Sequence, residues 1–379
     1  MLVCAGMAYG VLVHRWHLPP YGVLKAVHEA VSGQEPPPPR PTAPPEQLAT
    51  DISPLLGGRG PTEARALRRE LNELLWDAPT PPDSLRASVE RGIVDERYSG
   101  IRSLERIDRM SVSMEYGLNS VAYRFIPRPS NGALVLYHQG HDGDFALGQD
   151  RIVELLEHGY EVVALAMPLL GMNNQPVVEL PGIGIIKLTS HEQMDLLDPA
   201  QGHPVKYFIE PVVGVLNSLG GDRYSSISML GLSGGGWATT LAAAVDPRIE
   251  LSIPVAGSYP IFLRTGDGGD WGDFEQTAPA VYSRVNYLEL YVLGAYGAGR
   301  KQLQIFNEYD SCCFWGDRWT KYADSVAARV ERLGAGAFEV LADSSHTGHE
   351  ISSPVMQRIL SELEAMRRRA SGADPEAAG

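Results

Sequence analysis

The sequence has 379 residues, of which 44% are hydrophobic and 21% are charged, an ordinary composition for a globular protein that buries a sizeable core. Its 32 basic and 46 acidic residues give a formal net charge of −14, which opposes binding to nucleic acid and favours a small or neutral substrate. Two of its three cysteines, Cys312 and Cys313, are neighbours, so they give neither a disulfide framework nor a spaced metal-ligand pattern.

Residues 1–32 form an apolar N-terminal segment. Residues 1–13 carry no charge, and the HRWH sequence at 14–17 adds the basic and aromatic flank typical of a membrane interface. This stretch is shorter than the ~20 residues of a spanning helix, and the basic region that normally precedes a signal-peptide core is missing. We expect the end of a membrane anchor or a short export signal, and hence an anchored or exported protein. The alternative is an apolar helix packed on the domain of a cytoplasmic protein.

Residues 33–61 are rich in proline and glycine (EPPPPRPTAPPEQ, LLGGRGP), which predicts an extended linker without a core of its own. A helical extension should follow at 62–99. Within it, leucines at 67, 71, 74 and 75 have the spacing of one amphipathic helix over 62–76, which we expect to pack against the main domain.

From about residue 100 the predicted strands and helices alternate, and a disordered tail is expected at 371–379. The strands are expected at 106–114, 120–127, 133–138, 161–167, 226–230, 249–255, 302–307 and 338–342. The helices are expected at 150–159, 206–219, 235–245, 287–295, 320–332 and 353–368. This alternation predicts an α/β fold at 100–370, with a mostly parallel central sheet covered by helices on both faces.

The sequence GLSGGGW at 231–237 stands between a predicted strand and a predicted helix, the context in which G-x-S-x-G marks a nucleophile. A serine on such a sharp turn needs neighbours without side chains, because its backbone is strained and the helix passes close to the strand. We therefore predict Ser233 as the nucleophile. The alternative is a glycine-rich turn that carries an inert serine.

A serine hydroxyl needs a base to take its proton, and histidine has a suitable pKa. Two histidines follow the last predicted strand. We favour His349, which lies in GHEIS just before a helix, over His346 as the alternative base.

The third partner should be a carboxylate that orients the imidazole. Asp310 is the best candidate, since it follows the predicted strand 302–307 at the end where open α/β sheets place their functional loops. Asp317 and Asp343 are alternative acids.

Acyl transfer also needs donors for the developing oxyanion. We expect one to be the backbone N–H of Gly234, and the other to be that of His141 or Gly140, in the HQGHDGD turn at 138–144. The histidines of this turn could also bind a metal with Asp142 and Asp144, but the glycine spacing favours an oxyanion turn, so we expect neither a metal nor a cofactor.

The predicted strand order, the GLSGGGW turn, the HQGH turn, the Asp310 loop and GHEIS together resemble the α/β-hydrolase family over about residues 100–368. GHEIS is similar to the histidine segment of carboxylesterases in that family, which supports His349. The HQGH turn departs from the usual HG or HGGG, and no subfamily is assigned.

Two insertions follow carboxyl ends of predicted strands. The first, 168–204, is apolar and rich in glycine, which is consistent with a mobile lid. The second, 257–284, carries Asp267, Asp270, Asp273 and Glu275 beside Trp271. We expect the acidic loop 266–275 to be solvated, although it could bind a sugar or a cation.

These features favour hydrolysis of a carboxylic ester through an acyl-enzyme, with a small-molecule or saccharide ester as substrate. One alternative is a serine peptidase resembling the prolyl-oligopeptidase group. That group carries a propeller of at least about four blades, and the ~100 residues before the catalytic domain are too few to form one. Another is a catalytically inactive hydrolase scaffold that is used for binding.

Overall fold

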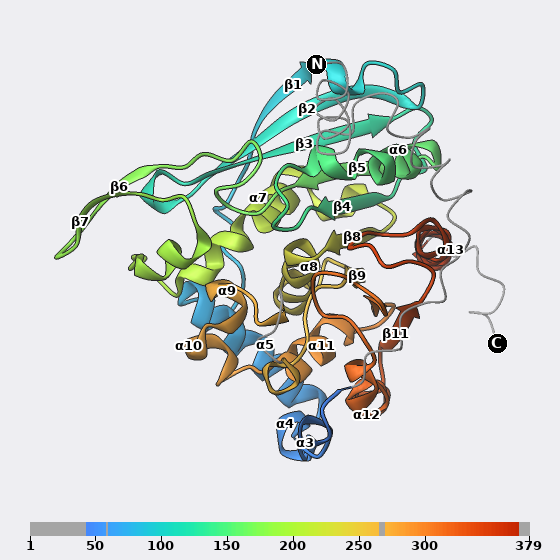
Figure 1. The fold of residues 1–379 in the computed structure, drawn as a ribbon. Coiled ribbons are helices and arrows are strands. Elements are labelled where there is room, and N and C mark those ends of the chain that lie inside the picture. Colours follow the sequence, from blue (N-terminus) through green and yellow to red (C-terminus); the bar gives the residue numbers. More distant parts are fainter. Residues whose placement is uncertain (1–42, 58–59, 265–269, 371–379) are drawn as a thin grey trace, which may run out of the picture. The chain divides into compact units, whose positions relative to one another are not determined.

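Nine strands form one central sheet in the computed structural model (Figure 1). Their order across the sheet is β1 (Ser88–Ile93), β2 (Leu104–Ser113), β3 (Asn119–Pro127), β5 (Glu161–Leu165), β4 (Leu134–His138), β8 (Ile227–Leu232), β9 (Leu251–Val255), β10 (Lys301–Asn307) and β11 (Ala337–Asp343). In this order, neighbouring strands from β1 through β3 to β5 pair antiparallel, and neighbouring strands from β5 through β4 to β11 pair parallel. Strands β4, β5, β8 and β9 are buried along their whole length, as expected for strands covered on both faces.

Helices bury apolar side chains against both faces of this sheet. One core contains side chains from α5 (Pro61–Trp76), α7 (Glu210–Leu219), α8 (Gly234–Val245), α11 (Tyr287–Ala295) and α12 (Ala323–Arg332). The other contains side chains from α6 (Gln149–Glu157) and α13 (Ser353–Ala370). The expected α/β class and the mostly parallel sheet with helices on both faces are therefore confirmed.

Strand β1 corrects the expected helical extension at 62–99. Helix α5 has the predicted bounds within one residue, but Ser88–Ile93 pairs with β2 and extends the sheet. The strand is exposed along nearly its whole length. Its sequence, SVERGI, has no alternation of apolar and polar residues that would mark a strand.

A second correction concerns the helix expected at 206–219, of which only Glu210–Leu219 is α-helical. A 3₁₀ turn, Pro204–Phe208, precedes it. Pro211 stands in the first turn of α7, a position that a proline accepts because its missing N–H has no partner within the helix there.

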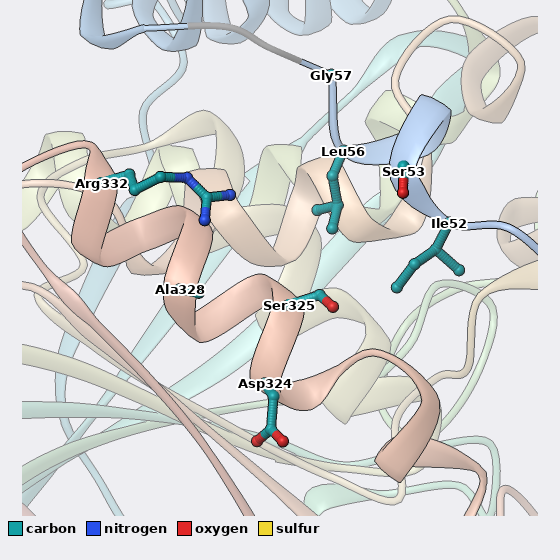
Figure 2. A pocket seen from close by; sticks show the side chains of 8 residues that line it. All are labelled: Ile52, Ser53, Leu56, Gly57, Asp324, Ser325, Ala328 and Arg332. Carbon is teal, nitrogen blue, oxygen red and sulfur yellow. The ribbon is translucent and has the colours of Figure 1, made fainter.

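Residues 43–57 correct the expected extended linker at 33–61. They contain two short helices, α3 (Pro45–Leu48) and α4 (Ser53–Leu56), and Asn286 Nδ2 donates to the Leu55 carbonyl over 2.9 Å. A cavity of about 360 Å³ lies between this segment and α12 (Figure 2). It is lined by Ile52, Ser53, Leu56, Gly57, Asp324, Ser325, Ala328 and Arg332. None of these is a predicted site residue.

The structure describes residues 43–57, 60–264 and 270–370. The predicted apolar segment 1–32, the tail 371–379 and Asp267 lie outside these residues. Within them, every helix is too short or too polar to cross a lipid bilayer.

Candidate active site

Ser233 stands at the turn where β8 ends and α8 begins. Its backbone has φ 58° and ψ −127°, a conformation that a residue with a side chain rarely adopts. Helix α8 starts at Gly234, directly after the serine, so the free N–H groups of its first turn lie beside the hydroxyl.

The glycines around Ser233 are required by close backbone contacts. A Cβ on Gly231 would lie 2.1 Å from the Gly235 carbonyl oxygen, and one on Gly235 would lie 2.0 Å from the His138 carbonyl oxygen. A Cβ on Gly236 would lie 2.8 Å from the Val255 carbonyl oxygen. The turn, the first turn of α8 and two neighbouring strands are therefore packed backbone against backbone.

His349 and Asp310 are brought together from two different loops. His349 Nδ1 lies 2.7 Å from Asp310 Oδ2, and the aspartate is buried. Its other oxygen, Oδ1, accepts the backbone N–H groups of Cys312 at 2.7 Å and Cys313 at 3.2 Å. Asn307 Nδ2 also donates to Oδ2, at 3.1 Å. These donors hold the carboxylate in one orientation toward the imidazole.

The other imidazole nitrogen of His349, Nε2, is buried and has no hydrogen-bond partner among the described residues. With Nδ1 directed at a carboxylate, the proton of a neutral ring stands on Nδ1. Nε2 is then free to accept a proton, which a general base requires. A hydrogen bond from the Ser233 hydroxyl to this nitrogen is not present, and such contacts are often longer before substrate binds.

The alternative residues have other partners. His346 Nε2 lies 3.0 Å from Asp343 Oδ2. Burial lowers the pKa of the His346 imidazole, but the Asp343 carboxylate raises it by more, so the pKa is raised overall. The Ser352 hydroxyl donates to the same oxygen of Asp343, and this bond joins the end of β11 to the residue before α13. Asp317 directly precedes a short 3₁₀ helix, Arg318–Lys321. The structure thus pairs His349 with Asp310 rather than with Asp317 or Asp343.

Sequence reasoning missed Asn307, Cys312 and Cys313 as residues that hold Asp310. The two cysteines are joined by a disulfide between adjacent residues, which was not expected from their count and spacing. An available signal was the sequence DSCC, because an aspartate at the start of a turn commonly accepts the N–H two residues on.

The HQGH turn after β4 lies directly against Ser233. A Cβ on Gly140 would lie 2.6 Å from Ser233 Cβ and 3.1 Å from the Gly234 nitrogen. A Cβ on Gly234 would in turn lie 2.4 Å from Cε1 of His141. The three residues expected to form the oxyanion hole, Gly234, His141 and Gly140, are thus in one place, directly beside Ser233.

Replacing Gly140 with alanine is expected to lower kcat/KM for an ester by about 100-fold, because the new methyl group would push the turn away from Ser233 and such shifts of ~1 Å misalign donors. The measurement is steady-state kinetics on the purified variant. Gly100→Ala is the matched control, since a Cβ at Gly100 meets nothing within 4 Å. Unchanged kinetics in Gly140→Ala would show that the turn takes no part in the reaction.

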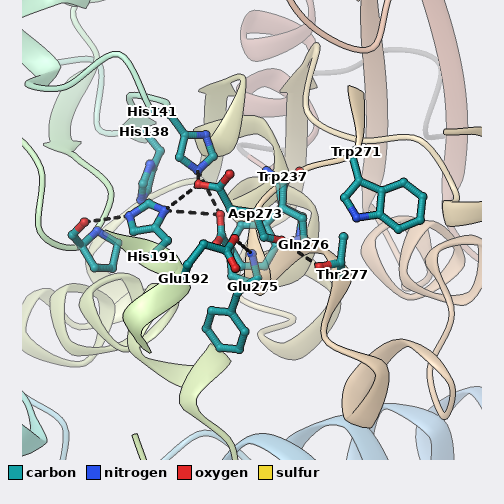
Figure 3. A network of polar contacts seen from close by, with 12 residues as sticks. His138, His141, His191, Glu192, Trp237, Trp271, Asp273, Glu275, Gln276 and Thr277 are labelled. Atoms are coloured by element: carbon teal, nitrogen blue, oxygen red, sulfur yellow. Dashed lines mark hydrogen bonds and ion pairs between the residues drawn. The ribbon is translucent and has the colours of Figure 1, made fainter. Parts of the chain in front are cut away.

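His141, in the HQGH turn, lies close to three side chains from the two insertions (Figure 3). His141 Nε2 lies 2.9 Å from Glu275 Oε1, and His191 Nδ1 lies 3.4 Å from Asp273 Oδ2. Burial disfavours the charge on Glu275, but hydrogen bonds from His141 and His191 lower the pKa of its carboxyl to about 2. Burial likewise opposes a charge on His191, but Asp273 and Glu275 raise its pKa to about 10.

The described part of the acidic loop, residues 270–275, is therefore not simply solvated. Glu275 and Asp270 are fully buried, and Asp270 Oδ2 lies 2.6 Å from Arg318 Nη1. Trp271 and Asp273 remain about half exposed. Sequence reasoning placed these charges in water because burial of a carboxylate depends on partners that are distant along the chain.

The first insertion, 168–204, contains a two-stranded hairpin of β6 (Val177–Leu180) and β7 (Gly184–Lys187), which extends away from the central sheet (Figure 1). Its exposed side chains include Val177, Ile183 and Ile185. Further along, a 3₁₀ helix, His191–Leu196, contacts α9 (Phe274–Thr277) of the second insertion, where Glu192 accepts the Phe274 N–H at 2.8 Å. The two insertions thus meet beside the HQGH turn.

Comparison with known proteins gives matches at the level of structure alone. No protein-family model matches the sequence, and no curated protein matches it. The structure is similar to the acetyl xylan esterase from Paenibacillus sp. R4, with a TM-score of 0.51 and 19% identity over 85% of this chain and 99% of that one. For acetyl xylan esterase 1 from Thermoanaerobacterium sp. JW/SL YS485 the TM-score is 0.53 and the identity is 13%, over 85% of this chain and 98% of that one. For the glucuronoyl esterase from Solibacter usitatus the TM-score is 0.51 and the identity is 13%, over 84% of this chain and 94% of that one.

Proposed function

We propose that this chain, which has the α/β-hydrolase fold, is a serine esterase that cleaves a carboxylic ester with Ser233, His349 and Asp310. The observation that carries the proposal is the pair formed by a serine in a strained strand-to-helix turn and a histidine fixed by a buried carboxylate. Backbone strain of this kind costs about 1–3 kcal/mol, and residues that carry it cluster at active sites and ligand-binding sites.

The proposed reaction begins when His349 Nε2 takes the proton of the Ser233 hydroxyl as its oxygen attacks the ester carbonyl. Negative charge then develops on the carbonyl oxygen, which accepts N–H groups from Gly234 and the HQGH turn. His349 returns the proton to the departing alcohol, and an acyl-enzyme remains. Water, deprotonated by the same histidine, releases the acid and restores the serine. Asp310 stays ionised throughout and stabilises the imidazolium.

We further propose that the ester is carried by a saccharide. Acetyl xylan esterases and glucuronoyl esterases are among the similar structures, and they match this chain over nearly their whole length. The net charge of −14 is compatible with a neutral acetylated sugar and unfavourable for a polyanion.

A panel of substrates tests the proposed reaction and substrate class. We expect the purified protein to hydrolyse 4-nitrophenyl acetate and acetylated xylo-oligosaccharides or a methyl glucuronoyl ester, and to leave a peptide anilide intact, because an amine leaves less readily than an alcohol. Release of 4-nitrophenol and, for the sugars, of acetate or methanol is the measurement.

Each contrary result supports a different function. Cleavage of the anilide alone would contradict the esterase and favour a peptidase. Turnover of none of these compounds would favour a catalytically inactive scaffold. Hydrolysis of 4-nitrophenyl acetate but of none of the sugar esters would support the proposed esterase activity and contradict only the proposed saccharide substrate.

A further inference from the structure

Four side chains with metal-ligating atoms converge beside the nucleophile turn, and we refer to them as the His2Asp/Glu cluster: His141, His191, Asp273 and Glu275 (Figure 3). One ligand atom from each lies within 4.8 Å of the other three. They come from three separate segments, namely the HQGH turn, the first insertion and the second insertion.

Three of the distances between these ligand atoms match those of a tetrahedral zinc site. Ligand bonds of about 2.0–2.2 Å place neighbouring ligand atoms of a tetrahedron about 3.3–3.6 Å apart. In the cluster, Asp273 Oδ2 lies 3.5 Å from His141 Nε2 and 3.4 Å from His191 Nδ1. Glu275 Oε1 lies 3.6 Å from His191 Nδ1. The fourth contact, His141 Nε2 to Glu275 Oε1, is a 2.9 Å hydrogen bond that would open by about half an ångström around an ion.

His191 is oriented as a metal-binding histidine. It is buried, and its Nε2 lies 2.9 Å from the carbonyl oxygen of Pro168, to which that nitrogen donates its proton. In a neutral ring the lone pair is then on Nδ1, which faces the carboxylates of Asp273 and Glu275. A backbone carbonyl that fixes the tautomer of a ligating histidine in this way is the usual second partner at zinc sites.

Glu275 gives an independent indication that a group is missing. Its side chain is fully buried, and its Oε2 has no hydrogen-bond partner among the described residues. A buried carboxylate oxygen without a partner is costly, and a cation bound at the neighbouring Oε1 would offset the charge of this carboxylate. Once the ion has displaced the Nδ1 proton of His191, the two neutral imidazoles and two carboxylates carry a charge of −2, which a divalent cation balances.

We propose that the His2Asp/Glu cluster binds one Zn²⁺ ion. Nitrogen and carboxylate ligands suit this ion, and four protein ligands leave no open position, which is the pattern of a structural rather than a catalytic site. The ion would tie both insertions to the HQGH turn. Since the His141 ring lies against Gly234, it would also fix the turn relative to Ser233. This inference departs from the expectation of no metal, which considered the HQGHDGD turn and the acidic loop separately and did not include His191.

The experiment is metal binding by the purified full chain after treatment with a chelator and dialysis. We expect one Zn²⁺ per chain by mass spectrometry of metals, a rise in Tm on adding Zn²⁺, and visible absorption bands of tetrahedral Co²⁺ when Co²⁺ is used as the probe. A metal-free wild type that takes up neither ion, or whose Tm does not change, overturns the proposal.

Two substitutions locate the ion. His191→Ala and Glu275→Gln should each weaken Zn²⁺ binding by more than 100-fold, because even loss of an outer partner costs about 10–100-fold. His158→Ala, at an exposed histidine outside the cluster, should retain one equivalent. Full retention by both cluster variants would place the ion elsewhere and overturn the proposal. If a variant does not fold, the Co²⁺ spectrum of the wild type still decides, since an octahedral spectrum contradicts the four-ligand site.

Discussion

Replacing Ser233 with alanine is expected to lower kcat for ester hydrolysis by about 10⁴–10⁶-fold, because the nucleophile is lost while the oxyanion donors and the binding surface remain. The same variant should no longer be labelled by a fluorophosphonate probe, which reacts with an activated serine. The Ser233 hydroxyl has no hydrogen-bond partner in the part of the chain that the structure describes, so its loss should change Tm little. The measurements are initial rates on 4-nitrophenyl acetate, in-gel fluorescence and thermal unfolding.

Ser225→Ala is the matched control, since this exposed serine stands just before β8, the strand that leads to Ser233. It should keep wild-type rates and labelling. Labelling that persists in Ser233→Ala would mean that another residue is the nucleophile. The unfolding curve is recorded for both variants, because an unchanged Tm shows that any loss of activity comes from the missing hydroxyl and not from unfolding.

The part of the site around Ser233 was predictable because it is local in sequence. The strand, the turn with its glycines and the helix occupy one continuous stretch, and each leaves its own pattern in the residues. The buried strands β4, β5, β8 and β9 were recognisable for the same reason, as short apolar runs bounded by turn residues. Position along the chain then ranked Asp310 and His349 above their rivals, and the structure pairs these two.

What the sequence did not reveal depends on contacts between distant segments. Glu275 is buried because His141 and His191, which are 134 and 84 residues away in the chain, surround its carboxylate. Nothing in the neighbourhood of an acidic loop residue records such partners. Strand β1 was missed for a related reason, because it joins the edge of the sheet through backbone hydrogen bonds that are nearly independent of side chains.

Replacing Asp310 with asparagine is expected to lower kcat by about 10⁴-fold with little change in KM. The direction of the effect follows from the hydrogen bonds at this carboxylate. The amide oxygen would take the place of Oδ1 and accept the N–H groups of Cys312 and Cys313, which leaves the NH₂ group facing His349. Nδ1 of His349 would then have to accept rather than donate, so the proton would move to Nε2. An imidazole protonated at Nε2 cannot take the proton of Ser233.

Asp317→Asn and Asp343→Asn separate this effect from a general loss of acidic charge. Asp317 should be neutral to substitution, since it is not the partner of His349. Asp343 holds His346 and Ser352, so its variant should lose stability more than kcat. A loss of kcat near 10⁴-fold in Asp343→Asn, with Asp310→Asn close to wild type, would transfer the role of the acid to Asp343 and require the histidine loop to rearrange on binding substrate. The ratio of the two kcat values therefore decides which carboxylate orients the base, independently of how tightly the ester binds.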